Sequence, residues 1–216
     1  MRGLECVMGF QELSLAKFAE VLASKEPTPG GGCASALAGA LAAGLVAMVA
    51  RTTAGSKKFA DRAGQMTAIA EEADRLRGEF LALVDEDARA FDQVMAAFRL
   101  PKETPEQQSA RSQAIQQAYK AAVDPPMKVC TRSVRVLELA HQVAEHGNPS
   151  AASDAGVGAL LAATALEGGG LNVQINLGSI KDDAFRSAQQ EKVRLAQSQG
   201  HVIRDKALAF VRGRLG

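Results

Sequence analysis

One carboxylate in this sequence stands out as a candidate for chemistry, Asp87 in the stretch VDEDARAF. At about 100° per residue it lies at the centre of a narrow apolar arc, whereas Asp85 and Asp92 point the other way. A carboxylate on such an arc costs free energy unless it is paired or used, and burial raises its pKa toward the range useful for acid–base work. Two interpretations stand, an ion pair with an Arg or Lys of another helix and a functional carboxylate. The arc consists of Leu76, Phe80, Leu83, Phe91, Val94 and Phe98.

A second group of polar residues lies in NPSAASDAGV, a loop that runs into an apolar helix. Ser153 or Asp154 can serve simply as the cap of this helix. Asp154 also shares a helical side with Val157 and Leu161, which predicts that it points inward, where it would meet a ligand. Asn148 precedes both in the same loop.

Two amides, Asn172 and Asn176, share a face with Ser179 if their segment is helical. Amides in a row suit hydrogen bonding to a heterocycle, although such faces are also often only solvated or structural. The segment from Leu171 to Leu177 alternates apolar and polar residues, which taken alone predicts a strand. No other stretch alternates convincingly, so we expect a helical turn or an extended edge.

The turn PTPGGGC places Gly30, Gly31 and Gly32 directly before an Ala-rich helix. Backbone N–H groups and the positive end of a helix dipole would converge there and suit a phosphate or carboxylate. This stretch lacks the sequence pattern of a loop that binds a nucleotide triphosphate. A tight turn between two helices would explain the three glycines equally well. Lys57 and Lys58 lie downstream in a basic cluster able to receive carboxylates, with a solvated surface as the default reading; Arg51 and Arg62 complete the cluster.

Composition and spacing argue against several other functions. The net charge of +1 gives no global attraction to nucleic acid or to an anionic membrane, and an aromatic content of 4% without Trp weighs against base-stacking modules. The uncharged run that ends at Ala50 is mostly Ala and Gly, so we do not expect a membrane span. The sequence does not indicate any serine that pairs with a His and an Asp, so it does not support a hydrolytic triad.

The cysteines and histidines show no metal-ligand spacing, so we expect no metal site. The cysteines are odd in number and far apart, and the apolar run in the first segment (MRGLECVMGF) is too short for a signal peptide. Together these features predict reduced thiols in the cytoplasm. The residues concerned are Cys6, Cys33, Cys130, His141, His146 and His201.

Helical periodicity dominates the chain and predicts an all-α fold with residues 1–216 as a single domain. Small residues on one side of the Ala-rich helix, among them Gly39, predict a buried central helix that packs closely within the subunit or at a dimer interface. We expect Gly147 to be a left-handed C-cap residue and the three glycines 168–170 to break the helix before them. The expected helices span residues 14–23, 33–53, 61–98, 104–123, 127–146, 153–167 and 182–212.

Four segments in order resemble the cyclodeaminase/cyclohydrolase family, known from the C-terminal domain of formiminotransferase-cyclodeaminase and from stand-alone methenyltetrahydrofolate cyclohydrolases. They are PTPGGGCASALAGALAAGLVAMV, VDEDARAF, SDAGVGALLAATALEGGGLNVQINL and KDDAF. The resemblance covers most of the chain from about Leu15 to the last helix. It implies a bundle of long antiparallel helices around a buried Ala/Gly-rich helix, a homodimer, a tetrahydrofolate substrate, no bound cofactor and no metal. It also implies that Leu171 to Leu177 is helical.

From this resemblance we expect a folate one-carbon enzyme, either a methenyltetrahydrofolate cyclohydrolase or, as the alternative, a formiminotetrahydrofolate cyclodeaminase. The competing hypothesis, from a different class of function, is a non-catalytic dimer that binds folate. Asp87 would shuttle the proton, and Asp154 with Ser153 and Asn148 would anchor the pterin ring or the reacting bridge. Asn172 and Asn176 would add hydrogen bonds, while Lys57 and Lys58 would bind the glutamate tail.

The chain departs from the family at two points. Cys33 stands where the family usually has Ser after the three glycines, which puts a hydroxyl-dependent contact in doubt while leaving the backbone donors. The sequence also contains no formiminotransferase segment, so we expect no activity of that kind.

Overall fold

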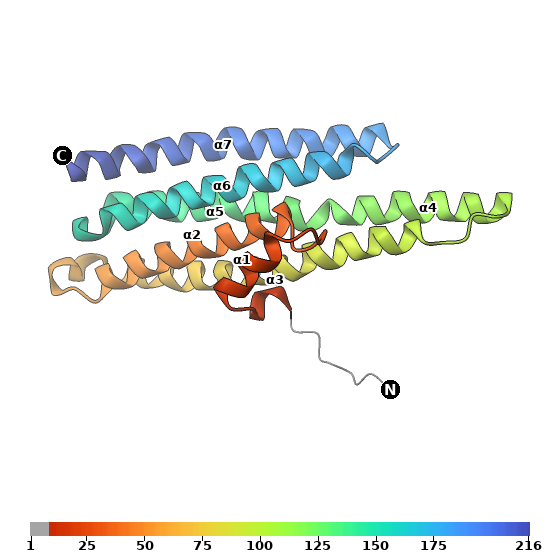
Figure 1. The fold of residues 1–216 in the computed structure, drawn as a ribbon. Helices are drawn as coiled ribbons and strands as arrows, with labels where there is room; N and C mark the ends of the chain where they lie inside the picture. Colours follow the sequence, from red (N-terminus) through yellow and green to blue (C-terminus); the bar gives the residue numbers. More distant parts are fainter. Residues whose placement is uncertain (1–8) are drawn as a thin grey trace.

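The computed structural model describes residues 9–216, and every regular element in this range is a helix (Figure 1). The expected all-α fold is therefore confirmed. Cys6 and most of the N-terminal segment considered as a signal peptide lie outside the described residues. The α-helices are α1 (Leu15–Leu22), α2 (Gly31–Ala54), α3 (Ala63–Phe98), α4 (Pro105–Ala122), α5 (Asp124–His146), α6 (Ala152–Leu177) and α7 (Asp183–Leu215), with 3-10 turns η1 (Phe10–Glu12), η2 (Lys57–Arg62) and η3 (Pro149–Ala151).

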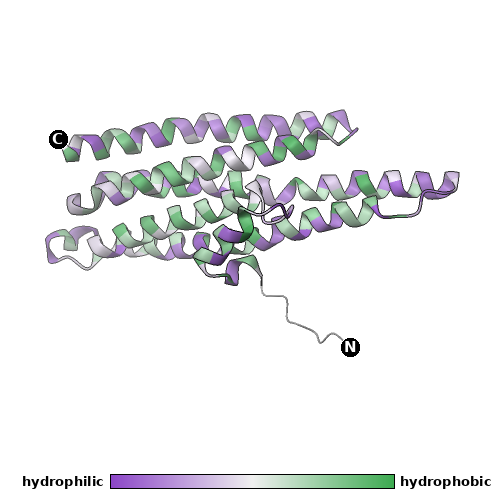
Figure 2. Ribbon diagram, viewed as in Figure 1, coloured by the Kyte–Doolittle hydropathy of each residue, from purple (hydrophilic) through white to green (hydrophobic). Residues whose placement is uncertain are grey.

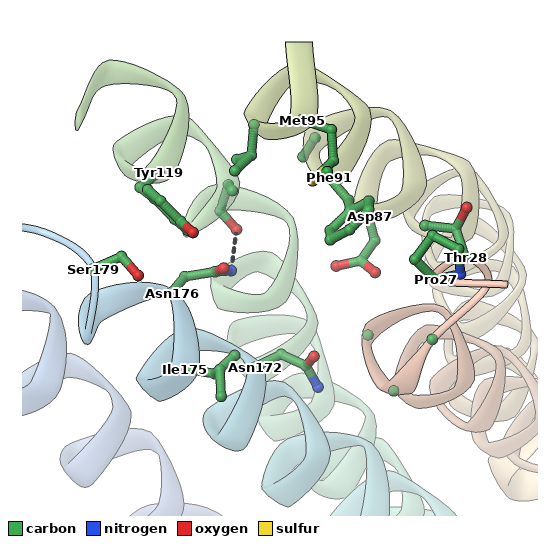
Figure 3. Close-up of a pocket in the computed structure, with 16 residues that line it drawn as sticks. Pro27, Thr28, Asp87, Phe91, Met95, Tyr119, Asn172, Ile175, Asn176 and Ser179 are labelled. Carbon is green, nitrogen blue, oxygen red and sulfur yellow. Dashed lines mark hydrogen bonds between the residues drawn. The ribbon is translucent and has the colours of Figure 1, made fainter. Parts of the chain in front are cut away.

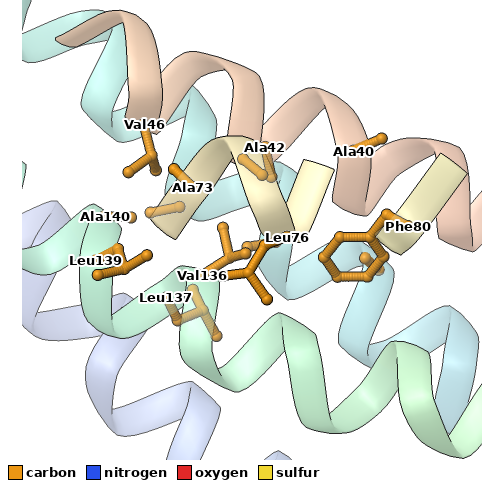
Figure 4. Packing of buried hydrophobic residues seen from close by; sticks show 14 of the residues in the cluster. Ala40, Ala42, Val46, Ala73, Leu76, Phe80, Val136, Leu137, Leu139 and Ala140 are labelled. Atoms are coloured by element: carbon orange, nitrogen blue, oxygen red, sulfur yellow. The ribbon is translucent and has the colours of Figure 1, made fainter. Parts of the chain in front are cut away.

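Four long helices, α2, α3, α5 and α6, form the bundle in which the core lies. Helix α2 packs against α3 and α6, α5 packs against α6 and α3, and α7 covers α5 and α6 (Figure 1). Side chains of three of these helices meet in the interior, where Val46, Leu76 and Leu137 interdigitate with alanines (Figure 4). Ala-rich faces let the helix axes approach closely, as the small residues of α2 predict.

The starts of three helices follow their predicted capping residues. The Oγ of Ser14 accepts the backbone N–H of Lys17, and Asp182 caps α7 through the N–H of Phe185. Thr104 and Gln107 form a reciprocal capping box with Pro105 at the first helical position. Local side-chain chemistry thus sets these boundaries to within a residue or two of the expected ones.

Two predicted boundaries around α5 are wrong. The helix begins at Asp124 rather than Met127, because Pro125 and Pro126 occupy its first turn, where no intrahelical N–H donor is needed. Gly147 ends the helix with φ −76° and ψ 175°, so it is extended and not left-handed. The chain leaves α5 through an extended residue that leads to the loop at Asn148.

The predicted helix break at residues 168–170 is also wrong, since α6 continues through the three glycines to Leu177. A side chain at any of the three would collide with a neighbouring helix. A Cβ at Gly168 would meet the Oγ of Ser35 on α2, and a Cβ at Gly169 would lie 2.9 Å from the Sγ of Cys130. The glycines therefore serve close packing of α6, and residues 171–177 are helical as the family resemblance implied.

Helix α2 is the one helix in residues 9–216 that is long and apolar enough to cross a membrane by length and composition. Of its most apolar window, 61% is buried inside the chain. Figure 2 shows that α2 is hydrophobic along most of its length, and burial of such a helix is what the centre of a bundle requires.

Two helical glycines in different surroundings provide a test of this packing. We expect Gly39→Ala to lower the free energy of unfolding by about 1 to 3 kcal/mol, because the new methyl group collides with the ring of Phe80. Gly78→Ala, the matched control, has nothing within 4 Å of its Cβ and should raise the free energy of unfolding by about 0.5 to 1 kcal/mol. Urea unfolding measures both, and equal stabilisation by the two substitutions would contradict the close approach of α2 and α3.

Candidate functional site

A pocket of about 320 Å³ opens where the N-terminus of α2 meets α3, the end of α4 and the end of α6 (Figure 3). This volume falls within the usual range for small-molecule sites. The pocket brings together six of the eleven predicted site residues, Gly30, Gly31, Gly32, Asp87, Asn172 and Asn176. The rest of the lining consists of Pro27, Thr28, Ala90, Phe91, Val94, Met95, Tyr119, Ala122, Ile175 and Ser179.

The Asp87 carboxylate points into this pocket and lies against the first turn of α2 (Figure 3). A Cβ at Gly32 would collide with both carboxylate oxygens, so only glycine allows this approach. No Lys or Arg pairs with Asp87 in residues 9–216, which removes the ion-pair interpretation within the described chain. The carboxylate instead lies where α2, capped by no side chain, presents its first N–H groups.

Burial raises the pKa of Asp87, and hydrogen bonds from the side chain and the backbone N–H of Cys33 oppose this rise. The Sγ of Cys33 lies 3.5 Å from Oδ2 of Asp87 and 3.3 Å from the carbonyl oxygen of Val84. Burial first, and the Asp87 charge second, raise the pKa of the Cys33 thiol to about 12. The Cys33 thiol is therefore a neutral hydrogen-bond donor to the Asp87 carboxylate.

The two amides on α6 face Asp87 across the pocket (Figure 3). Nδ2 of Asn172 donates to the carbonyl oxygen of Gly168 at 2.8 Å, and Nδ2 of Asn176 donates to that of Ala122 at 2.9 Å. Each amide thus uses one of its two N–H donors to bind the backbone, and its carbonyl oxygen accepts no hydrogen bond within the described residues, so this oxygen is free to bind a ligand. Two acceptors opposite a carboxyl group suit a flat heterocycle that carries N–H donors.

The sequence reasoning missed several lining residues. Phe91 and Met95 follow Asp87 at four-residue spacing on α3, so their place in the pocket follows from helical period. Tyr119 and Thr28 come from other segments, and no local pattern indicated them. Tyr119 is held by an edge-on contact with Phe98, at 6.2 Å between ring centroids.

Asp85 has a structural role that the sequence reasoning also missed. It is buried under the N-terminal segment, and its Oδ1 accepts the backbone N–H of Phe10 at 2.7 Å. It therefore points away from Asp87, as predicted, but it anchors η1 on α3 instead of facing solvent.

The other five predicted residues lie at the opposite end of the bundle. Lys57 and Lys58 follow α2 in the turn η2, while Asn148, Ser153 and Asp154 lie in η3 or its flanks and the first turn of α6. The backbone N–H of Asn148 donates to Oγ1 of Thr53 at 2.8 Å, which ties that loop to the end of α2. Since α2 has 24 residues, this end lies about 36 Å from the pocket. One chain does not bring the two groups together.

The prediction that Asp154 points inward toward a ligand stays a prediction. Asp154 is half-buried, and of the residues that share its side of α6, Val157 is 47% exposed whereas Leu161 is partly buried against the core. The small residues Ala155, Ala159 and Ala162 form the side that packs into the bundle. Within the described residues, the side chains of Ser153 and Asp154 make no hydrogen bond or ion pair.

No group of three or more His, Cys, Asp or Glu residues within residues 9–216 is arranged to hold a metal ion. Cys33 and Cys130, the two described cysteines, are free thiols and buried. The pocket offers the carboxyl group of Asp87, backbone donors of the first turn of α2, the amides of Asn172 and Asn176, and hydroxyl groups that come from Thr28, Tyr119 and Ser179.

Comparisons with known proteins agree with this geometry. A sequence profile of the family described as "Formiminotransferase-cyclodeaminase" matches residues 14–195. A "Methenyltetrahydrofolate cyclohydrolase" from Methylorubrum extorquens is 36% identical over 202 residues, which cover 94% of this chain and 97% of the relative. A "Formimidoyltransferase-cyclodeaminase" from Gallus gallus is 36% identical over 182 residues, but the match covers only 33% of that longer protein.

A solved structure shares the fold. The crystal structure of a formiminotetrahydrofolate cyclodeaminase from Thermotoga maritima superimposes with a TM-score of 0.86 at 29% identity. The match covers 95% of this chain and 99% of that one.

The raised pKa of Asp87 has a consequence for stability. Because folding raises this pKa, the native state binds more protons than the unfolded chain between the two pKa values, and stability falls as the pH rises through that window. We expect Asp87→Asn to remove this loss, so that its melting temperature relative to the parent rises from acid to neutral pH. Asp92→Asn, the exposed control, should not change the pH dependence, and parallel curves for parent and Asp87→Asn would contradict the assignment.

Proposed function

We propose that this chain, which belongs to the formiminotransferase-cyclodeaminase family, is a methenyltetrahydrofolate cyclohydrolase. The observation that carries the proposal is the end-to-end match to the cyclohydrolase of Methylorubrum extorquens, in which nearly all of both chains align. The match to the formimidoyltransferase-cyclodeaminases of Gallus gallus and Rattus norvegicus covers only 33% and 34% of their length.

The pocket supports this chemistry. Hydrolysis of the methenyl bridge adds a water oxygen to the carbon that joins two folate nitrogens, and then breaks one carbon–nitrogen bond to leave a formyl group on the other nitrogen. Asp87 would accept one proton from the attacking water and return it to the nitrogen that leaves, while the second water proton passes to solvent as the cationic methenyl bridge becomes a neutral formyl group. A carboxyl group whose pKa is raised by burial suits both steps, because its conjugate base accepts a proton more readily than an ordinary carboxylate does.

The remaining pocket residues would hold the substrate. The carbonyl oxygens of Asn172 and Asn176 would accept N–H groups of the pterin ring, and Tyr119 and Phe91 would provide apolar surface beside it. The first turn of α2 at Gly30, together with Gly31 and Gly32, would offer backbone donors to oxygen atoms of substrate or intermediate.

The second candidate is a formiminotetrahydrofolate cyclodeaminase, and the full-length likeness to the Thermotoga maritima structure favours it. In that reaction one folate nitrogen attacks the formimino carbon attached to the other, and ammonia leaves with a proton that Asp87 would supply. The same pocket serves both reactions, since both pass through a tetrahedral carbon between the two nitrogens.

We further propose a homodimer located in the cytoplasm, with no bound cofactor, metal, nucleic acid or membrane partner. An outward apolar face on α2 and α6 supports the dimer; Leu41, Met48, Val157, Leu160, Leu171 and Ile175 form it, and we call it the α2–α6 face. The two free buried thiols suit a reducing compartment.

The test of function is an absorbance assay of the purified protein. We expect methenyltetrahydrofolate to lose its near-ultraviolet band faster than in buffer, and Asp87→Asn to slow this loss by about 100-fold or more. Asp92→Asn should retain the parent rate. A band that appears from formiminotetrahydrofolate with ammonia release would select the cyclodeaminase, and no change with either substrate would overturn both.

The contact between Cys33 and Asp87 predicts a shift in the pH profile. A hydroxyl is a stronger hydrogen-bond donor than a thiol, so Cys33→Ser should lower the apparent pKa of the acidic limb of kcat/KM. Cys33→Ala removes the donor and should raise it. Cys130→Ser changes a thiol outside the pocket and should not shift the apparent pKa of this limb. An unshifted pKa in all three proteins would contradict the influence of Cys33 on the pKa of Asp87.

A further inference from the structure

The pocket wall across from Asp87 is built by two segments that are distant in the sequence (Figure 3). Tyr119 and Ala122 come from the last turn of α4. Asn176 and Ser179 come from the end of α6 and from the linker that follows it. A ligand that touches both segments therefore depends on how these two segments are held together.

Helix α4 has little apolar packing of its own. Ala122 is the one residue of this helix that is buried. Tyr119 is half-buried, and its ring packs against the Phe98 ring and against a small apolar cluster that contains Leu177. Elements with few buried apolar contacts open at a lower free energy than the core does, so polar contacts decide how firmly such an element is placed.

One side chain, Gln116, joins α4 to the linker between α6 and α7 (residues 178–182, the α6–α7 linker). Its Nε2 donates to the carbonyl oxygen of Ser179 at 2.9 Å, and its Oε1 accepts the backbone N–H of Lys181 at 2.7 Å. The two partners fix the orientation of the amide, because the carbonyl oxygen needs a donor and the N–H needs an acceptor. Gln116 therefore binds the linker backbone with both ends of its amide group.

The position of Gln116 on α4 connects this contact to the pocket. Tyr119 follows Gln116 by three residues, so the two side chains lie on one side of the helix. Ser179, whose carbonyl oxygen accepts the Gln116 amide, lines the pocket as well. The same amide thus influences the placement of one lining residue from each of the two segments.

The other side-chain contact of α4 with the α6–α7 linker is an exposed ion pair. Nζ of Lys120 lies 2.6 Å from Oδ2 of Asp182, and its hydrogen bond lowers the pKa of that carboxyl group. Exposed pairs of this kind contribute little free energy and are screened by salt. The bonds of Gln116 join uncharged groups, so salt does not screen them in this way.

We propose that Gln116 is a positioning residue for the substrate: it holds the α6–α7 linker against α4 and so fixes the wall in which Tyr119 and Ser179 contact the pterin ring. This proposal rests on the proposed function for its substrate. Gln116 does not line the pocket, and it lies on neither α2 nor α3, the helices that place Asp87 and its donors. Its loss would therefore weaken the binding of substrate and transition state alike and leave the proton exchange as it is.

Steady-state kinetics of methenyltetrahydrofolate hydrolysis test this role. We expect Gln116→Ala to raise KM by about 5- to 10-fold and to change kcat by less than about twofold, because the lost bonds contribute to binding and not to the chemical step. The acidic limb of the pH profile of kcat/KM should keep its apparent pKa, since Cys33 and Asp87 are unchanged. An unchanged KM, or a loss confined to kcat, would overturn the positioning role.

Gln117→Ala is the matched control. Gln117 is the next residue of α4, is exposed and makes no hydrogen bond within residues 9–216, so the same truncation there should leave KM and kcat at the parent values. Gln116→Glu keeps the acceptor for the N–H of Lys181 but loses the donor to Ser179, so its KM should lie between those of the parent and Gln116→Ala. An equal rise of KM in Gln117→Ala would overturn the specific role of Gln116.

Tyrosine fluorescence tests the same contact without folate turnover. The chain contains one Tyr and no Trp, so this emission reports on Tyr119 alone. We expect acrylamide to quench it more strongly in Gln116→Ala, because α4 opens more often once the linker is released, whereas Gln117→Ala should match the parent. Equal quenching in all three proteins would overturn the role of Gln116, whatever the substrate is.

The two measurements separate this proposal from the proposed function. If the parent turns over neither folate, the absorbance assay overturns the function, while the fluorescence still decides whether Gln116 places Tyr119. Circular dichroism of each variant at the assay temperature checks that the helical fold is intact.

Discussion

The approach of the Asp87 carboxylate to the first turn of α2 is the constraint on which the site depends. It requires glycine at position 32, because any Cβ there would occupy the space of the carboxylate oxygens. It also requires that α2 and α3 pack closely, which Gly39 allows by leaving room for the ring of Phe80. The glycines before and within α2 are therefore parts of one arrangement. The turn that precedes the helix and the packing along it both serve the placement of one acid.

Small residues also allow α6 to pack closely against its neighbours. Glycines 168–170 let this helix lie against α2, α5 and α7, and the next turns carry Asn172 and Asn176. Each amide is fixed by a hydrogen bond from its nitrogen to a backbone carbonyl, so the oxygen that faces the pocket has little freedom. Rigid placement of this kind lowers the entropy that a bound ligand must remove.

The pocket and the far end of the bundle differ in charge. The electrostatic arrangement is uneven, since Asp87 is alone among apolar and amide groups while Lys57 and Lys58 are exposed at the other end. An outward apolar face joins the two ends. In the proposed homodimer, contact with a second copy of the chain would remove the apolar side chains of this face from water.

The sequence by itself determined most of the helices, several of their caps and the pocket residues Asp87, Asn172 and Asn176, because helical period and capping are local properties. It failed at glycines 168–170 and Gly147, where a local rule predicted a break or a left-handed residue and the packing or path of the chain decided otherwise. Only the tertiary structure showed that Asp85 anchors Phe10, that Tyr119 lines the pocket, and that Asp154 lies at the other end of the bundle from Asp87. These facts depend on which helix lies beside which, and a helix with apolar residues on two sides does not reveal from its sequence which side meets the core of its own chain.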